Sequence, residues 1–433
     1  MPKPAALLCS LLLLPLLATA PALGSGWPQW RGPANNGVAP DAHDLPARWS
    51  KTENLRWRLP LPGPAASTPV VWGDTLYLTS AVGDELALLA IGRDGRELWR
   101  RTVEEGGNYV ARAGETNAAS PSPVTDGETV WVTLGTGTVA AYSLAGEERW
   151  RADLEQRYGA FDYYFGMSST PLLDGDTLYF LLLHTGAQLV VALDTETGAE
   201  GWRHPRATDA RAECLHSYAS PVIFRAGEEE MLLVQGADYL TAHDPATGAE
   251  LWRHGGLNPQ ESYNPSLRFV ATPAVAGELV VLPSAKNGPV VGLEPAGARG
   301  VITGSDPHTR WRLDSGTPDV PSPVVHDGLV YLSRETGVLT VVDAATGGLV
   351  YAERVHGAPH RGSPVVADGK VYLSGNDGTV SVVRAGRAFE LLAKNELGER
   401  LQASPVVVGD TIYLRTYDAL YAVGRSAPSP AGP

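Results

Sequence analysis

The stretch DTETGAEGWR at residues 194–203 returns with small changes as DPATGAELWR at residues 244–253. Both copies contain Asp-x-x-Thr-Gly and end in Trp-Arg. DAATGGLVYA at residues 343–352 follows the same pattern with tyrosine in place of tryptophan. A pattern that recurs with a period of about 50 residues is the sequence signature of a repeat architecture, in which each unit is one supersecondary structure.

A Ser/Thr-Pro pair marks the start of each repeat. Proline is tolerated at the first residue of a strand, where its missing N–H costs no ladder hydrogen bond. Successive pairs are 41 to 54 residues apart, which is a spacing typical of propellers and other closed arrays. The eight pairs are Thr68-Pro69, Ser122-Pro123, Thr170-Pro171, Ser220-Pro221, Thr272-Pro273, Ser322-Pro323, Ser363-Pro364 and Ser404-Pro405.

Each repeat is predicted to form four short strands joined by tight turns. The apolar segment after the proline, as in SPVVADG (363–369), ends at an Asp-Gly or Gly-Asp turn, which favours a hairpin because the turn needs positive φ. A second strand such as VYLSG (371–375) and a third strand follow, and the fourth ends in an aromatic residue. No repeat has room for a crossover helix. We therefore predict an all-β, eight-bladed β-propeller of four-stranded antiparallel blades.

Five aromatic residues stand four positions after a glycine, namely Trp99, Trp150, Trp202, Trp252 and Tyr351, and Trp57 and Trp311 match them through their Trp-Arg pair. The glycine supplies the left-handed turn between the third and fourth strands, and the ring is then predicted to pack between neighbouring blades. These rings are interpreted as structural rather than as sugar-stacking groups. The residues assigned to this inter-blade role are Trp57, Trp99, Trp150, Trp202, Trp252, Trp311 and Tyr351.

The eighth repeat has no fourth strand of its own. It ends after ALYAVG (419–424), whereas NLRWRLP (54–60) precedes the first Ser/Thr-Pro pair and resembles a fourth strand. We predict that this N-terminal strand closes the last blade and leaves no open sheet edge at the seam. The propeller would then span residues 54–425, with an irregular N-terminal arm at 25–53 and a disordered tail at 426–433.

The first 24 residues are typical of a secretory signal peptide. Lys3 precedes an apolar run that begins at Ala5, and small residues follow it, so cleavage is expected after Ala22 or Gly24. Cys9 lies inside the apolar run without the small residues that precede a lipidated cysteine. The prediction is a periplasmic or secreted protein that does not span the membrane.

Charge and cysteine content exclude several classes of protein. The net charge of −14 argues against binding to nucleic acid or to anionic membranes as the main task, because both require basic surface. After cleavage Cys214 would be the remaining cysteine, so no intramolecular disulfide is expected and stability has to come from packing.

The chain resembles the pyrroloquinoline-quinone-like propeller repeat proteins in three features. These are the Asp-x-x-Thr-Gly-x-x-x-Trp motifs, the Ser/Thr-Pro pairs at the strand starts and the opening WPQWRG (27–32). The resemblance covers roughly residues 27–425. This family includes secreted BamB-like propellers, which are binding scaffolds, and more distantly the quinoprotein alcohol dehydrogenases. The resemblance implies the propeller fold, but a fold does not specify an activity.

The sequence departs from both branches of this family. The dehydrogenases are similar to one another in carrying a vicinal Cys-Cys disulfide beside the quinone and calcium ligands below it, whereas this chain has no Cys-Cys pair and no Cys-x-x-Cys-His haem site. BamB-like lipoproteins use a lipidated cysteine near their start, which is missing here. No cofactor is predicted, and pyrroloquinoline quinone (PQQ) with calcium is kept as an alternative.

The predicted meander places two kinds of loop on opposite faces. Blade-to-blade connections and the turns between second and third strands share one face, and the Asp-Gly and Thr-Gly turns share the other. The connections are long and rich in aromatic and amide residues, so their face is the predicted surface for a partner or ligand. Its candidate residues are Tyr109, Asn117, Tyr158, Tyr163, Tyr164, His216, Tyr218, Arg268, Lys286, Arg334, His360 and Arg361.

FDYYFG (161–166) is the densest aromatic patch on this face. Its rings either contact a partner or fold inward and fix the loop on the propeller, and tyrosine suits both roles. The histidines show no metal-binding spacing such as His-Glu-x-x-His. Cys214 and His216 have the residue types of a nucleophile and its base, but a structural buried thiol is the commoner explanation.

We predict a monomeric, non-enzymatic scaffold that presents the loop-rich face to an envelope or secreted protein partner. No catalytic, cofactor-binding or metal-binding residue is assigned. The family resemblance implies a role in outer-membrane protein assembly. Two alternatives stay open, a quinone- or metal-dependent oxidoreductase that uses the central funnel and a carbohydrate-binding propeller that uses the tyrosine-rich rim.

Overall fold

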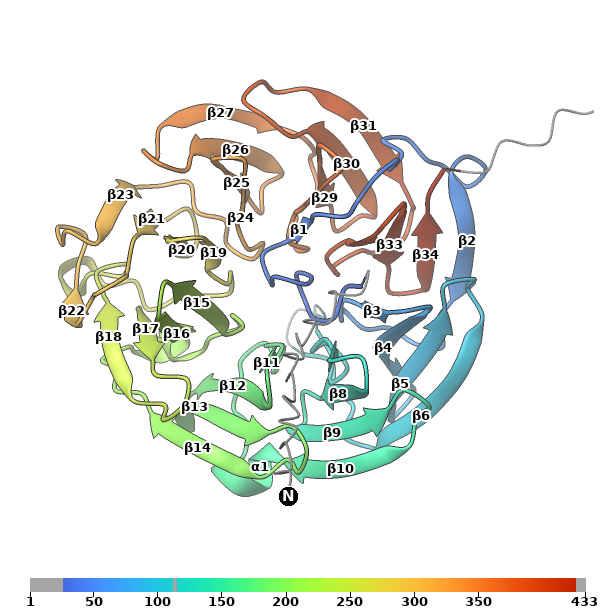
Figure 1. Cartoon of the computed structure of the whole chain (residues 1–433), viewed down its shortest axis with the longest axis horizontal. Helices are drawn as coiled ribbons and strands as arrows, with labels where there is room; N and C mark the ends of the chain where they lie inside the picture. The colour runs from blue at the N-terminus through green and yellow to red at the C-terminus, as the bar shows by residue number, and fades with distance from the viewer. Residues whose placement is uncertain (1–25, 112–113, 115, 426–433) are drawn as a thin grey trace, which may run out of the picture.

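Tight turns with positive φ fold each repeat back on itself. Asp327 and Gly328 adopt φ values of 49° and 69°, and Val324 pairs with Tyr331 across this turn. Left-handed backbone costs most residues about 1–2 kcal/mol, and Asp and Gly tolerate it best. The result is an antiparallel meander that recurs around a ring (Figure 1).

The computed structural model describes residues 26–111, 114 and 116–425. The signal peptide predicted for residues 1–24 and the tail predicted for 426–433 lie outside these residues. In chain order, the first blade consists of β3 (Val70–Trp72), β4 (Thr75–Val82), β5 (Glu85–Gly92) and β6 (Glu97–Glu105), the second of β7 (Val124–Thr125), β8 (Thr129–Thr133), β9 (Thr138–Ser143) and β10 (Glu148–Asp153), and the third of β11 (Leu172–Asp174), β12 (Thr177–His184), β13 (Ala187–Asp194) and β14 (Glu200–Pro205). The fourth blade consists of β15 (Val222–Ala226), β16 (Glu229–Gly236), β17 (Tyr239–His243) and β18 (Glu250–His254), the fifth of β19 (Ala274–Ala276), β20 (Leu279–Pro283), β21 (Val290–Leu293) and β23 (Thr309–Leu313), and the sixth of β24 (Val324–His326), β25 (Leu329–Ser333), β26 (Val338–Asp343) and β27 (Leu349–Arg354). The seventh blade consists of β28 (Val365–Ala367), β29 (Lys370–Ser374), β30 (Thr379–Arg384) and β31 (Leu391–Glu396), and the eighth of β32 (Val406–Val408), β33 (Thr411–Arg415), β34 (Ala419–Val423) and β2 (Leu55–Pro60).

These eight blades confirm the predicted eight-bladed propeller. Two sheets carry a fifth strand that the sequence analysis did not foresee: β1 (Val38–Ala39) pairs parallel to β28, and β22 (Gly300–Ile302) pairs parallel to β18. The helical elements of the described residues include α1 (Leu154–Tyr158) and the 3-10 turns Ala212–Leu215 and Gln260–Ser262.

The inner strands are buried along most of their length because a neighbouring blade covers each of their faces. The strand β25, with sequence LVYLS, is buried at every position, whereas the outer strand β27 is mostly exposed. This sandwiching explains why short continuous apolar runs, rather than alternating patterns, mark the strands in the sequence.

Most of the recurring indoles hydrogen-bond to the next blade. Trp57, Trp150 and Trp202 donate from Nε1 to the carbonyl oxygens of Arg93, Thr195 and Pro245, over 2.7, 2.8 and 2.9 Å. Gly248 shows why a glycine is needed at this turn. It has φ 75°, and a Cβ there would lie 2.3 Å from the ring of Trp202 in the preceding blade.

Trp252 behaves differently from the other indoles. It is buried, and its Nε1 contacts the sulfur of Met231 in its own blade at 3.1 Å. Its strand, β18, is covered by β22, with Trp252 opposite Gly300. The extra strand therefore encloses this indole from outside.

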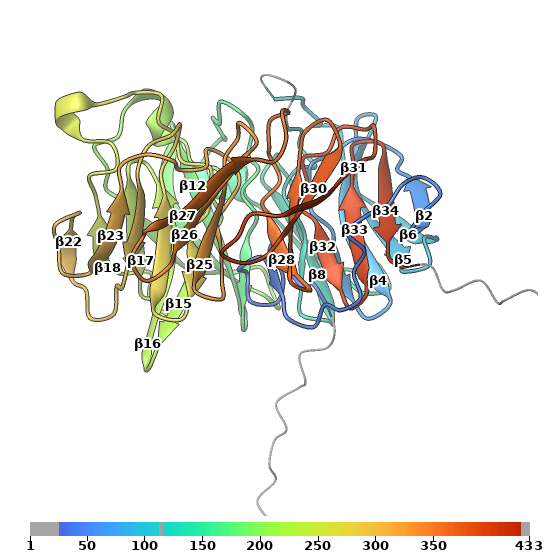
Figure 2. The same ribbon diagram turned by 90° about the horizontal axis from the view of Figure 1, so that it is seen from above.

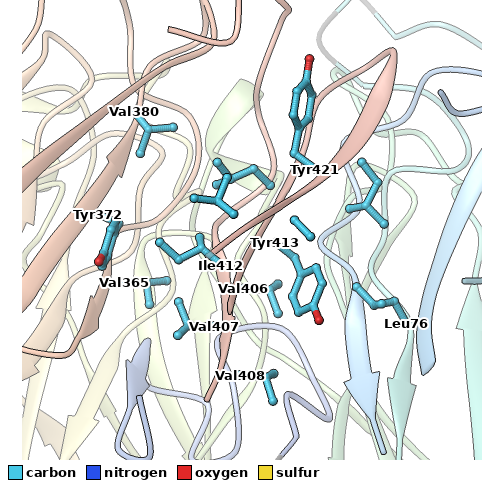
Figure 3. Packing of buried hydrophobic residues seen from close by; sticks show 14 of the residues in the cluster. Leu76, Val365, Tyr372, Val380, Val406, Val407, Val408, Ile412, Tyr413 and Tyr421 are labelled. Carbon is cyan, nitrogen blue, oxygen red and sulfur yellow. The ribbon is translucent and has the colours of Figure 1, made fainter. Parts of the chain in front are cut away.

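The seam of the ring is closed by β2, as predicted. Trp57 lies opposite Ala422 and Arg58 opposite Tyr421 in the antiparallel pairing of β2 with β34. The side chain of Arg58 also reaches Glu399 at 2.6 Å. Figure 3 shows the valines and tyrosines of this last blade packed between the blades on either side of it.

A closed circle of hydrogen bonds joins all eight blades at their inner edge. The backbone N–H of each Ser/Thr in the Ser/Thr-Pro pairs donates to the hydroxyl oxygen of its counterpart in the next blade, over 2.8 to 3.2 Å. The last bond, from the N–H of Ser404 to the hydroxyl of Thr68, joins the end of the chain to its beginning. We call this set the hydroxyl ring.

The N-terminal arm covers one mouth of the central channel. Trp27 exchanges two backbone hydrogen bonds with Val71 in the first blade, and the arm then crosses the centre of the ring to form β1 on the seventh (Figure 1). Arg31 is buried in this arm, where it donates to the carbonyl oxygens of Asn36 and Pro323. Figure 2 shows the arm on the face opposite the long loops.

The hydroxyl ring yields a first prediction. Ser322→Ala removes the acceptor of the Thr272 N–H and leaves that buried donor unpaired, so the free energy of unfolding should fall by about 1–3 kcal/mol. Ser322→Thr keeps the hydroxyl and is the matched control, because threonine occupies three other ring positions. Urea titration measures both variants, and equal stability of Ser322→Ala and wild type would contradict a stabilising ring.

A second prediction concerns the seam. Trp57→Ala should lower the free energy of unfolding by about 2 kcal/mol or more, because a half-buried indole and its hydrogen bond to Arg93 are both lost. Trp57→Phe keeps the apolar ring and should cost less. Leu98→Ala, at a position on β6 that is 53% exposed, is the control and should change stability by less than about 0.5 kcal/mol.

Candidate functional site

The segment 161–166 folds inward over the third blade. Tyr163 lies among Phe161, His184 and Tyr218, with ring centroids 4.7 to 6.1 Å apart. Its hydroxyl donates to the carbonyl oxygen of Leu181, and burial raises its pKa well above the usual value. Tyr164 is the exception, since 43% of it is exposed. The patch therefore divides into rings that fix the loop and one ring that faces solvent.

Two buried histidines hold this segment from below. The Nδ1 of His216 accepts the backbone N–H of Tyr164 at 3.0 Å, and its Nε2 lies 2.9 Å from the hydroxyl of Thr185. The Nδ1 of His184 accepts the N–H groups of Asp162 and Gly186. Burial lowers the pKa of both imidazoles, that of His184 to about 4, so both are neutral at neutral pH.

A cleft of about 630 Å³ opens over the second blade on the loop-rich face, between the loops that follow the first and second blades. Three carboxylates line it, and no lysine or arginine does so among the described residues. We call it the rim cleft; its polar and aromatic lining consists of Glu104, Tyr109, Thr136, Thr138, Asp153, Glu155, Phe161, Tyr163 and Tyr164. Val110, which is 72% exposed, follows Tyr109 directly, and Tyr164 lies in the wall. The cleft thus combines negative charge with the exposed ring of Tyr164.

The carboxylates of the rim cleft are fixed by local hydrogen bonds. Glu104 accepts the hydroxyls of Thr136 and Thr138 at 2.8 and 2.6 Å, and Glu155 accepts the N–H of Phe161 at 2.7 Å. Asp153 caps α1 by accepting the N–H of Gln156. These contacts hold the acidic groups in place without neutralising their charge.

A second cavity, of about 170 Å³, occupies the centre of the ring. Residues of the hydroxyl ring form its lower wall, and Trp30 of the N-terminal arm also lines it, with its Nε1 3.4 Å from the hydroxyl of Ser404. The upper wall comes from the blade-to-blade loops. We call this cavity the central funnel; its upper lining includes Thr116, Phe165, Tyr218, Arg268, Val270, Val320, Arg361 and Gln402.

Both charged residues in the funnel lining are arginines. Arg268 stacks over the ring of Phe165, 4.5 Å from its centroid, and pairs with Glu213 at 3.2 Å. Arg361 pairs with Glu335. Neither glutamate lines the cavity. Among the described residues the funnel therefore presents positive charge without a lining carboxylate.

The structure divides the predicted face residues among these places. Tyr109, Tyr163 and Tyr164 line the rim cleft, and Tyr218, Arg268 and Arg361 line the central funnel, whereas His216 supports the segment between them. The other candidates lie apart from both cavities and make local contacts: Asn117 with Pro64, Tyr158 with Glu200, Arg334 with Asn287, His360 with Ser333, and Lys286 in an exposed turn.

Sequence reasoning missed the carboxylates of the cleft and the hydroxyls of the funnel. Glu104, Asp153 and Glu155 come from two different blades, and no sequence spacing relates them. The hydroxyls belong to the Ser/Thr-Pro pairs, in which the proline alone is sufficient to indicate the start of a strand. Position within the repeat was the signal that could have identified them.

Cys214 lies in a polar cluster between two long loops rather than in a catalytic pair. Its thiol contacts the carbonyl oxygen of Asn264 at 3.2 Å and the amide of Asn258 at 3.5 Å. Burial raises its pKa, which disfavours the reactive thiolate. His216 is engaged by Tyr164 and Thr185 instead.

The resemblance to quinoprotein dehydrogenases implies PQQ above a calcium ion, and the residues present do not fit that pair. Within the described ranges no group of three or more His, Cys, Asp or Glu side chains could hold a metal ion. The charged lining of the funnel is arginine, which cannot supply the oxygen ligands that calcium needs. The funnel volume of about 170 Å³ is also below the 300–1,000 Å³ typical of cofactor sites.

Comparison with solved structures identifies propellers of different activities. BamB from Moraxella catarrhalis is 17% identical, with 89% of this chain and 98% of that chain covered and a TM-score of 0.60. The quinohemoprotein alcohol dehydrogenase from Comamonas testosteroni is 14% identical (94% and 82% covered, TM-score 0.67), and a europium-containing methanol dehydrogenase is 13% identical (91% and 90% covered, TM-score 0.70). At these identities the likeness shows the fold alone.

A comparison with curated proteins finds no match. No helix in the described part of the chain has the length and apolar character needed to cross a membrane. A family model described as "Outer membrane protein assembly factor BamB" matches residues 45–157, 135–301 and 298–426, which together span the propeller. The chain therefore belongs to this BamB family of pyrroloquinoline-quinone-like propellers.

Proposed function

We propose that this protein is a non-enzymatic scaffold that binds a protein partner on its loop-rich face. The observation that carries the proposal is the rim cleft, where fixed carboxylates lie with the exposed ring of Tyr164 in the wall and the exposed Val110 follows the lining residue Tyr109 in the chain. Exposed apolar groups beside fixed charges are the usual anchors of a protein interface. The opposite face offers less to a partner at its centre, because the N-terminal arm covers it.

The cleft favours a partner segment with basic and apolar side chains. Three carboxylates line the cleft without a lysine or arginine among its described lining residues, which favours a basic group, and the faces of Tyr109 and Tyr164 add cation–π and apolar contacts. The inward rings of Phe161 and Tyr163 keep the cleft preformed, so little conformational entropy is lost on binding.

Family membership supports a place in the cell envelope. A propeller that follows a signal peptide would act in the periplasm or outside the cell, as a monomer that contributes to outer-membrane protein assembly. The carbohydrate alternative of the sequence analysis has weaker support, because sugar stacking needs exposed ring faces and Tyr163 is held inward against His184 and Tyr218, which leaves Tyr164 as the exposed tyrosine of the segment 161–166. The quinone alternative would require the funnel to hold a cofactor that its lining does not fit.

The binding proposal predicts a selective loss of affinity. A partner captured from the envelope fraction and then purified should bind the Val110→Ser/Tyr164→Ser variant at least tenfold more weakly than wild type, a loss of about 1.4 kcal/mol or more. Isothermal titration measures both. Leu349→Ser, at a position on the outer strand β27 that is 68% exposed, removes an equally exposed apolar group and should bind like wild type.

Equal losses in the cleft variant and the Leu349→Ser control would show that the contact is nonspecific. Unchanged affinity of the cleft variant would place the partner elsewhere and refute the proposal.

The histidine support predicts a pH dependence. Because folding lowers the pKa of His184 from about 6.5 to about 4, the unfolded state takes up a proton first, and the free energy of unfolding should fall as pH decreases from 6.5 to 4. His184→Asn keeps an acceptor for the N–H groups of Asp162 and Gly186 but cannot titrate. Urea titrations between pH 6.5 and 4 should show that the free energy of unfolding of His184→Asn falls by roughly 2 kcal/mol less than that of wild type. An identical pH profile in the variant would contradict this origin.

A further inference from the structure

The outer edge of the fourth blade is covered by a strand, whereas the other blades end in their own outer strands within the described residues. The covering strand, β22, belongs in sequence to the fifth blade but pairs in parallel with β18 of the fourth blade (Figure 1). Gly300 lies opposite Trp252, and Ile302 lies opposite His254. The chain thus shows which sequence, direction and register this edge accepts in an added strand.

The pairing leaves one buried imidazole without a partner. His254 is 0% exposed, and neither of its ring nitrogens forms a hydrogen bond to another described residue. Ile302, its neighbour across the pairing, is buried and apolar. We infer that the edge of β18 binds an extended segment of a protein partner in place of β22, with a serine or threonine side chain opposite His254.

The unpaired imidazole makes β22 an imperfect occupant of this edge. Burial lowers the pKa of His254 to about 4, so at neutral pH the ring is neutral and has one donor and one acceptor. Arg312 and Asp306 act on it through their charges and not through a hydrogen bond. A buried polar group without a partner costs free energy, and a hydroxyl, which both donates and accepts, recovers part of it.

The segment that carries β22 is attached by few buried groups. Residues 296–304 are exposed except for Ala298 and Ile302. Beyond the strand pairing, Glu229 of the fourth blade forms an ion pair with Arg299 at 3.5 Å. Segments with few buried apolar groups open locally at a low cost in free energy. Release of β22 would leave the four strands of the fourth blade in place and expose the edge of β18.

The register of β22 defines the segment that fits. Glycine is favoured opposite Trp252, because Gly300 has φ 69° there. The next side chain is free to vary, since Val301 is 68% exposed. A basic residue before the glycine would pair with Glu229, as Arg299 does. The predicted partner segment is therefore a parallel strand with a basic residue, glycine, any residue, and then serine or threonine.

Peptide binding to a chain without β22 tests the inference. In this variant, residues 294–308 are replaced by the five-residue turn 344–348 of the sixth blade. The threonine peptide is acetyl-Ala-Arg-Gly-Val-Thr-Thr-amide, and its matched control has valine at the fifth position, which has nearly the same shape but no hydroxyl. We expect the threonine peptide to bind at least tenfold more tightly than the valine peptide in isothermal titration. Equal affinities would overturn the role of His254, and absence of binding would overturn the site.

Two variants of the full-length chain keep the test decisive if the shortened chain does not fold. Ile302→Gly removes the buried side chain of β22, so the threonine peptide should bind this variant at least tenfold more tightly than it binds wild type. Leu349→Ser, on the outer strand β27, is the control and should bind like wild type. Adding His254→Phe to Ile302→Gly should abolish the preference for threonine, and retention of that preference would refute the proposed contact.

The edge of β18 and the rim cleft fail independently. The Val110→Ser/Tyr164→Ser variant should bind the threonine peptide as wild type does, because β22 lies at the outer rim of the ring. If the peptide does not bind the edge while the cleft variant loses the natural partner, the edge site is refuted and the scaffold function stands. If the peptide binds and the cleft variant keeps the partner, the rim cleft is refuted instead.

Discussion

The hydroxyl ring is the constraint on which the rest of the propeller depends. Each Ser/Thr-Pro pair gives its one N–H to the hydroxyl of the next blade, and the proline that follows has no N–H left to satisfy. The circle is complete only when the N–H of Ser404 meets the hydroxyl of Thr68. Blades can therefore differ in length by many residues, because their inner starts are fixed relative to one another and the variation is confined to the loops.

The N-terminal segment makes the two faces of the propeller differ. The chain enters the ring from one side, where Trp27 and β1 pair with inner strands and Arg31 is buried below the centre. It then continues into β2 to complete the eighth blade. The strand β2, which closes the seam, thus follows directly on the arm that covers the channel. The long connections between blades lie on the other face.

Much of this fold could be predicted from the sequence because the determining signals are local. The Asp-Gly turns, the Ser/Thr-Pro starts and the position of Trp57 each follow from a few neighbouring residues. The strand β22 could not be predicted, because three residues, Gly300–Ile302, form it only through parallel pairing with the distant β18. The site was less predictable still. Whether Tyr163 faces inward depends on His184 and His216, and nothing in the segment 161–166 indicates where those imidazoles lie.

The two cavities of the loop-rich face are lined by described side chains of opposite charge and share one wall. Tyr163 and Tyr164 line the acidic rim cleft, while Phe165, the next residue, lines the funnel and carries Arg268 on its ring. A face of uniform charge would attract any chain of opposite sign, whereas neighbouring sites of opposite sign admit a segment in one orientation. The segment 161–166 therefore lies between the two cavities, and its inward rings fix its position and with it the spacing between the two sets of charges.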